Sequence, residues 1–147
     1  MIDAILQRLQ EIIGGKVTTS TEPSSEIHFV DLGLPSGTLW ADRDVAVRPL
    51  DESSLPSYEQ AQELIECCDF CIRTTPDGEK SISVLGPSGK FIYFPMEDYE
   101  GTPGPSGCCW CRGGGTEEFG YFLLLSKASI TIGAGHKSLK FPYRMVL

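Results

Sequence analysis

The sequence lacks several features that would assign it to common protein classes. It has no apolar run approaching about 18 residues, so no membrane-spanning helix is expected. It has no cluster of Lys and Arg, and its net charge is −8. Nucleic acids and anionic membrane surfaces bind basic faces, so neither is an expected partner. No basic start followed by an apolar block marks a secretion signal. We therefore expect a protein made and kept in the cytoplasm unless it leaves within a larger particle.

Histidine is also scarce, with only His28 and His136 present. A nucleophilic Cys or Ser needs a nearby base, and neither histidine stands in a recognisable catalytic motif. The sequence therefore predicts a protein that is not an enzyme. What is present is 41% hydrophobic residues, 16 Gly and 10 Pro in 147 residues, which indicates one globular domain with many turns.

The first fifteen residues have the pattern of an amphipathic helix. Their apolar side chains recur at steps of three and four residues until Gly14 and Gly15 end the pattern. A helix this short needs a docking partner, which is either the rest of the chain or other copies of itself. We expect residues 1–15 to be an oligomerising or anchoring stem, with a trimer as one arrangement, followed by a linker at residues 16–26. The candidate contact residues are Ile2, Ile5, Leu6, Leu9, Ile12 and Ile13.

Residues 27–147 have the pattern of a head domain with one helix and many short strands. Ser57 and Gln60 form a capping-box pattern after Pro56, which predicts a helix at about residues 57–67. Strand patterns precede and follow it, with a hairpin around the turn at residues 86–89 and a central strand at 121–125. Alternating apolar residues at 139–147 predict a closing strand with one buried face. The connections are short, so the expected class is α+β with mainly antiparallel strands.

Six cysteines occur in two clusters that include two C-x-x-C spacings. The favoured interpretation is that they are free thiols packed as small apolar side chains. Two alternatives stay open, namely disulfide bonds formed in an oxidising setting and a tetrahedral zinc site. The zinc ligands would be Cys68, Cys71, Cys108 and Cys111.

Several motifs of the head resemble the Fibrobacter succinogenes major paralogous domain. The strongest is VDLGLPSGTLWA at residues 30–41. LPS at 55–57, LGPSGK with IYFP at 85–95 and the segment around Trp110 are similar to later motifs of that family. The resemblance covers residues 27–147 and implies a C-type-lectin-like fold without established catalysis. The segment after Trp40 is shorter than the family pattern, and the family's usual secretion signal is absent.

The resemblance, taken with the stem, suggests a lectin-like binding or structural module of a bacteriophage virion, such as a capsid decoration or fibre protein. Its partners would be further copies of itself and surface proteins or glycans. The alternatives are a cytoplasmic, zinc-stabilised interaction domain and, less favoured, an enzyme of the formylglycine-generating type. Ligand contacts are expected on loops 97–107, 112–118 and 133–138. The candidate ligand-binding residues are Asp98, Tyr99, Glu100, Arg112, Glu117 and His136.

Overall fold

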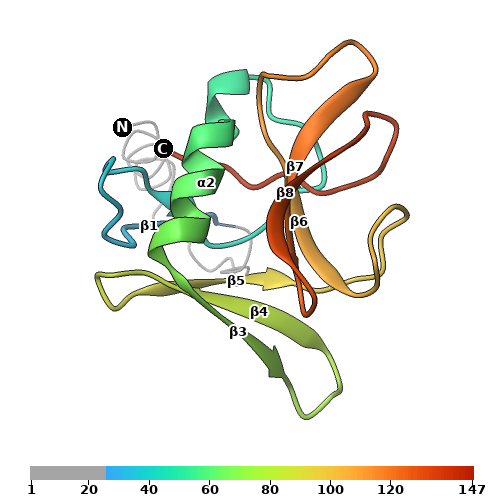
Figure 1. The fold of residues 1–147 in the computed structure, drawn as a ribbon. Helices are drawn as coiled ribbons and strands as arrows, with labels where there is room; N and C mark the ends of the chain where they lie inside the picture. The colour runs from blue at the N-terminus through green and yellow to red at the C-terminus, as the bar shows by residue number, and fades with distance from the viewer. Residues whose placement is uncertain (1–25) are drawn as a thin grey trace, which may run out of the picture.

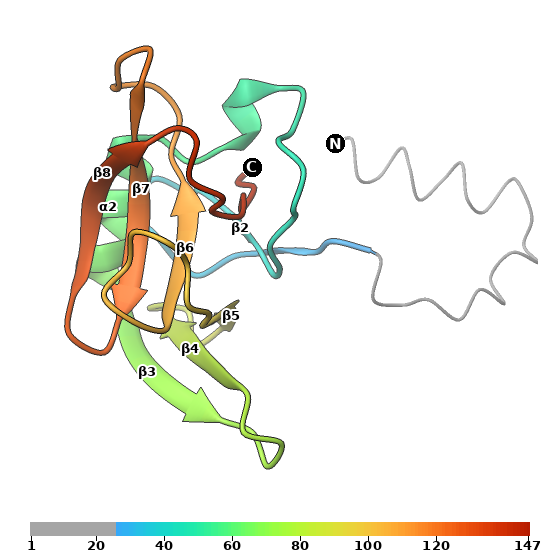
Figure 2. The ribbon, with the colours of Figure 1, turned by 90° about the vertical axis from the view of Figure 1, so that its right-hand side faces the viewer.

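The computed structural model of the protein describes residues 26–147 (Figures 1 and 2). The predicted stem, residues 1–15, and the linker up to residue 25 lie outside the described residues. The described part contains one α-helix, α2 (Tyr58–Cys67), and one 3-10 helix, η3 (Glu52–Ser54). Its strands are β1 (Phe29–Val30), β2 (Trp40–Ala41), β3 (Asp69–Thr74), β4 (Lys80–Leu85), β5 (Phe91–Pro95), β6 (Ser106–Trp110), β7 (Phe119–Ser126) and β8 (Ile130–His136).

The α+β class is confirmed by how these strands pair. Sheets of two and three strands form in the orders β1-β2, β3-β4-β5 and β6-β7-β8, and every strand pair is antiparallel. Consecutive strands are neighbours because the connections between them are short. Among residues 26–147 no helix has the length and apolar character needed to span a bilayer.

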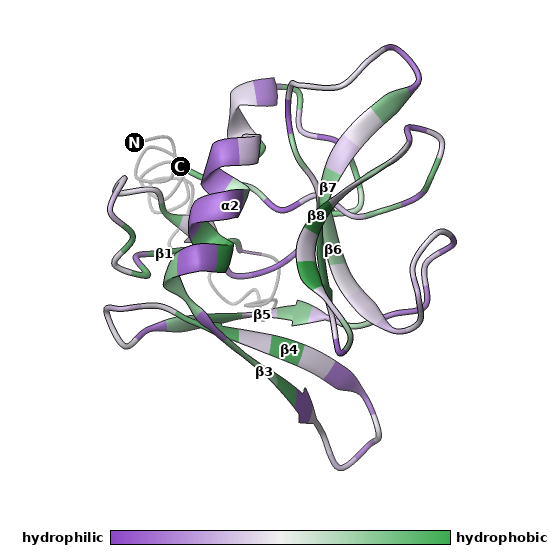
Figure 3. Ribbon diagram, viewed as in Figure 1, coloured by the Kyte–Doolittle hydropathy of each residue, from purple (hydrophilic) through white to green (hydrophobic). Residues whose placement is uncertain are grey.

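Helix α2 begins where the capping box predicts. The Ser57 hydroxyl accepts a hydrogen bond from the Gln60 backbone N–H at 3.1 Å, and the Ser57 N–H donates to the Gln60 side chain at 2.8 Å. These two bonds satisfy donors that an uncapped helix leaves free. The helix buries Ala61 and Leu64, while its other side is mainly hydrophilic (Figure 3). The expected helix at 57–67 is confirmed.

Strand β7 lies at the centre of its sheet and separates two hydrophobic clusters. Leu123 and Leu125 point into the larger cluster, which α2 covers, and Tyr121 meets Tyr58 of α2 edge to face at 5.3 Å. Phe122 points the other way, into a smaller aromatic cluster with Trp110 and Phe141. Side chains alternate between the faces of a strand, so β7 is covered on both sides, as its continuous apolar run predicted.

The predicted loop at 133–138 is wrong, because residues 133–136 belong to β8. Gly133 and Gly135 lie against the ring of Phe122. A Cβ at Gly133 would approach that ring to 3.0 Å, and a Cβ at Gly135 would approach it to 3.2 Å. Glycine here makes room for an aromatic ring within the sheet, whereas the sequence pattern had suggested a turn.

The predicted loop at 97–107 is also too long, because Ser106 and Gly107 begin β6. A Cβ on Gly107 would lie 2.7 Å from Cβ of Phe94. Gly107 therefore allows β6 to pass closely over β5, and this contact joins the two three-stranded sheets.

The predicted closing strand at 139–147 does not form. Only isolated bridges occur there, Tyr143 with Val45 and Val146 with Trp40, and the buried side chains are those of Phe141, Arg144 and Val146. Pro142 has no N–H to donate to a ladder, and Arg144 takes a buried position that the alternating pattern assigned to its neighbours. Leu39 and Leu147 nevertheless exchange two backbone hydrogen bonds of 2.9 Å, so the end of the chain lies beside the start of the head.

Candidate functional site

The loop before β6 contributes exposed acidic residues but not an exposed tyrosine. Asp98 and Glu100 are exposed. Tyr99 between them turns inward and meets the ring of Phe141 edge to face at 5.8 Å. Burial, aided by the negative charges of Glu97 and Asp44, raises the pKa of Tyr99. Tyr99 therefore anchors the loop to the aromatic cluster, which leaves Asp98 and Glu100 as its accessible candidates.

The loop after β6 likewise contains one residue that anchors it to the domain and another that is exposed. Arg112 donates from Nε to the carbonyl of Leu55 at 2.8 Å, and its backbone N–H bonds to Pro56 at 2.8 Å. It therefore ties the end of β6 to the segment before α2. Glu117 is exposed, and so is His136, whose Nδ1 lies 2.8 Å from the hydroxyl of Ser138.

These six predicted residues do not form a single site. Asp98, Tyr99 and Glu100 precede the start of β6, whereas Arg112 and Glu117 follow its end (Figure 1). His136 lies near the second group because it pairs with Phe119 across the β7–β8 ladder. The structure thus separates the predicted loops into two locations at opposite ends of one strand.

A surface pocket of about 210 Å³ lies at the end of β6, beside the second group. Trp110, Tyr143 and the glycine loop at residues 113–115 line it. Gly113 and Gly114 have φ angles of +69° and +75°, which glycine adopts without strain. Among the described residues no acceptor bonds to the N–H groups of Gly113, Gly114 or Gly115. These three successive N–H groups beside the pocket are therefore hydrogen-bond donors available to an anionic ligand.

Two cationic side chains stand at this pocket. Lys137 forms no ion pair with any described residue. Arg48 pairs with Glu52 and lies over the ring of Tyr143, 5.9 Å from its centroid. The pocket therefore combines one free positive charge, one partly neutralised charge and two aromatic rings.

Sequence patterns did not identify this pocket as a site. Arg48 and Glu52 come from one part of the sequence and Lys137 and Tyr143 from another, and only folding brings them beside the glycine loop. The run of three glycines at residues 113–115, within the predicted contact loop 112–118, was the one local signal. Trp110 is only 5% exposed and packs in the core, although it also contributes to the lining of the pocket.

The six cysteines are free thiols in the structure. Cys108, Cys109 and Cys111 are buried in or beside β6, whereas Cys71 is exposed on β3. Within residues 26–147 no three Cys, His, Asp or Glu side chains are placed to bind a metal, so the zinc set proposed from sequence is not assembled. Burial raises the pKa of the Cys108 and Cys111 thiols to about 12, and that of Cys68 to about 11. Zinc binds thiolates, which this environment disfavours.

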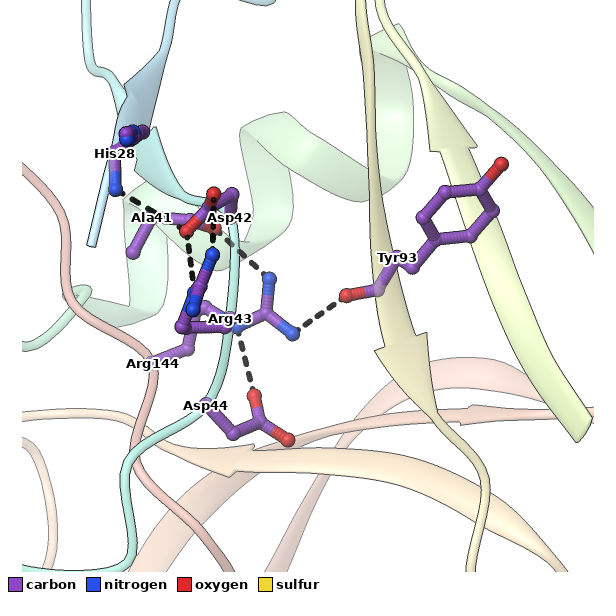
Figure 4. Close-up of polar contacts among 7 residues, drawn as sticks. All are labelled: His28, Ala41, Asp42, Arg43, Asp44, Tyr93 and Arg144. Carbon is purple, nitrogen blue, oxygen red and sulfur yellow. Dashed lines mark hydrogen bonds and ion pairs between the residues drawn. The ribbon is translucent and has the colours of Figure 1, made fainter. Parts of the chain in front are cut away.

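A buried arginine forms the most extensive polar cluster of the core (Figure 4). Arg144 is fully buried, and its Nε donates to Asp44 at 2.7 Å. Its two terminal nitrogens donate to the carbonyls of Ala41 at 2.8 Å and Tyr93 at 2.6 Å. The guanidinium lies over the ring of Phe94, 3.9 Å from its centroid. Burial raises the pKa of Asp44, and the nearby Arg144 charge offsets this only in part.

Buried charged groups often mark functional sites, but every nitrogen of Arg144 already donates to a protein oxygen. The cluster joins the segment after β2, strand β5 and the C-terminal segment. Its evident role is to hold the two ends of the head to the β3-β4-β5 sheet.

Comparison with protein-family models, curated protein sequences and solved structures gives no match to this chain.

Proposed function

We propose that residues 27–147 form a non-enzymatic, C-type-lectin-like recognition head that binds an acidic sugar in the pocket at the end of β6. The observation that carries the proposal is the coincidence, at one surface pocket, of three unpaired backbone N–H groups and the unpaired Lys137. In keeping with the family resemblance, we place this head on the surface of a phage virion, where it meets host glycans. The N-terminal stem would attach it or join its copies.

A carboxylate is the ligand group that this chemistry fits. Charge-assisted hydrogen bonds from backbone N–H groups and a lysine stabilise an anion more strongly than they stabilise a neutral hydroxyl. Arg48 already forms an ion pair with Glu52, so Lys137 is the cation that remains available to a ligand. The overall charge of −8 would repel anions at a distance. Binding of an anion would therefore depend on the short-range contacts inside the pocket.

The aromatic side chains supply a second contact for a sugar. Tyr143 is half-buried and Trp110 presents an edge to the pocket. An apolar sugar face can pack against such rings while its polar groups reach the loop, the usual composition of a small-ligand site. The pocket is small, so it would hold one sugar residue of a longer glycan.

The test uses glucuronate and glucose, which differ in the carboxylate, with the 15N-labelled full chain. Glucuronate should shift the amide signals of Gly113, Gly114 and Gly115, and glucose should bind at least about tenfold more weakly, the equivalent of one charge-assisted hydrogen bond. Lys137→Gln should weaken glucuronate binding, and Glu52→Gln should strengthen it by freeing Arg48. Lys127→Gln, at the other end of the β7–β8 hairpin, is the matched control and should change nothing. Equal binding of both sugars, or shifts away from residues 113–115, would refute the proposal.

A further inference from the structure

Strand β3 is an outer strand whose free side is open to solvent. Among residues 26–147 it pairs only with β4, in continuous register from Asp69 opposite Leu85 to Thr74 opposite Lys80. Within the described part of the chain, no backbone hydrogen bond joins β3 to any other element. Five of its six residues are exposed, and Phe70 is half-buried. Figure 1 shows β3 along the lower margin of the molecule, away from β6, β7 and β8.

This edge lacks most of the features that usually prevent strands from pairing between molecules. Protective edges carry charged side chains, most often lysine, or Pro, a bulge or an element that covers them. Strand β3 has no Pro or Lys, and its register with β4 runs without a bulge through all six residues. Its two charged residues, Asp69 and Arg73, have opposite signs and form no ion pair with any described residue.

The order of residues in β3 is complementary to itself when the strand is reversed. In an antiparallel pair centred on Cys71, Asp69 stands opposite Arg73 of the second copy, and Phe70 stands opposite Ile72. Directly opposed residues lie on the same face of a sheet, so each Asp–Arg pair would form a cross-strand ion pair. A twofold axis through Cys71 repeats the pair, as in an isologous dimer.

We propose that β3 strands of two copies pair edge to edge in this register, which joins two three-stranded sheets into one of six strands. Six strands is an ordinary size for a sheet. The contact area is small, so the pairing would be weak between separate chains and favoured wherever copies are held close together. This interface is independent of the sugar pocket, which lies on the other three-stranded sheet.

Cysteine cross-linking of the full chain tests the register. In antiparallel sheets the α-carbons of opposed residues are about 4.5 to 5.5 Å apart, within the range that a disulfide spans. Copper phenanthroline, as oxidant, would remove two electrons and two protons from a pair of Cys71 thiols. The expected product is a covalent dimer that reduction reverses and that Cys71→Ser abolishes. Absence of a Cys71–Cys71 product at high protein concentration would overturn the proposal.

Charge reversal tests specificity with matched variants. Asp69→Arg gives two Arg pairs in the homodimer, and Arg73→Asp gives two Asp pairs, so each variant alone should cross-link several-fold less than the parent chain. A mixture of the two variants restores both opposite-charge pairs and should regain cross-linking as a heterodimer, which mass spectrometry identifies. Lys90→Glu, on the β4–β5 turn, is the control and should behave as the parent. Cross-linking that ignores these charges would show that Cys71 residues meet by chance collision, and the proposed register would be wrong.

Discussion

The two three-stranded sheets have the same antiparallel order, yet their aromatic residues differ in how far they are exposed to solvent. In β6-β7-β8, Trp110 and Phe122 are each 5% exposed and pack on Phe141, whereas Phe119, at the start of β7, is 48% exposed. In β3-β4-β5, Phe91 and Tyr93 are 49% and 43% exposed, although they contact each other edge to face at 5.2 Å. The difference arises because α2 and the C-terminal segment cover both faces of the first sheet, whereas nothing in the described chain covers the outer face of the second.

The contrast shows that an aromatic side chain in a strand is buried only where another element covers its face of the sheet. Ile92 and Phe94 of β5 alternate with Phe91 and Tyr93, and only the first pair enters the core. The covered sheet supplies stability and holds the pocket loop. The open sheet leaves an edge and a face for contact with other molecules.

Replacing matched phenylalanines should separate the two sheets most clearly. Phe122→Ala empties a packed aromatic position and should lower the free energy of unfolding by about 4 kcal/mol. Phe91→Ala removes an exposed side chain and should cost about 0.5 kcal/mol or less. Urea unfolding followed by tryptophan fluorescence measures both. Similar losses for the two variants would mean that the outer face of the second sheet is covered in solution.

Arg144 holds the two ends of the head to the β3-β4-β5 sheet, and its removal should give the next largest effect. Arg144→Met leaves Asp44 buried without its cation and removes donors from the carbonyls of Ala41 and Tyr93. We expect a loss of about 3 kcal/mol in the free energy of unfolding.

The matched control for Arg144 is Arg43→Met. The Arg43–Asp42 pair, at 3.1 Å, is exposed enough for solvent to screen it, so Arg43→Met should lose far less stability than Arg144→Met. If both variants lost the same stability, the buried cluster would have no special role in holding the ends of the head to the β3-β4-β5 sheet.

Local signals in the sequence predicted the local parts of the fold. The capping box at Ser57 fixed the start of α2, and the turn at residues 86–89 fixed the hairpin of β4 and β5, because both depend on neighbours in the chain. The apolar run of β7 predicted a doubly covered strand for the same reason.

Contacts between distant residues could not be predicted in this way. The glycines of β8 resembled a turn because the ring of Phe122 that requires them is eleven residues away from Gly133. The alternation at residues 139–147 ended at a buried Arg144, whose partner Asp44 is 100 residues away. The pocket at the end of β6 likewise exists only once Arg48, Lys137 and Tyr143 meet.

The alkylation rates of the cysteine thiols compare the two sheets without any substitution. Cys71 on the open sheet should be alkylated first by iodoacetamide at pH 8, and the half-buried Cys67 more slowly. With a pKa of about 12, Cys108 and Cys111 on the covered sheet are thiolates in only about one molecule in ten thousand at that pH. They should react only on unfolding, which peptide mass spectrometry would show.

The same pKa shifts determine whether the free energy of unfolding rises or falls with pH. Between pH 9 and 12 the Cys108 and Cys111 thiols stay protonated in the folded state and ionise in the unfolded state. The unfolded state therefore binds fewer protons, and the free energy of unfolding falls as pH rises through this window. Cys111→Ala removes one of these groups and should reduce the slope, which urea unfolding at several pH values measures. Rapid alkylation of Cys108 in the native protein would show instead that the sheet containing β6 opens as readily as the exposed one.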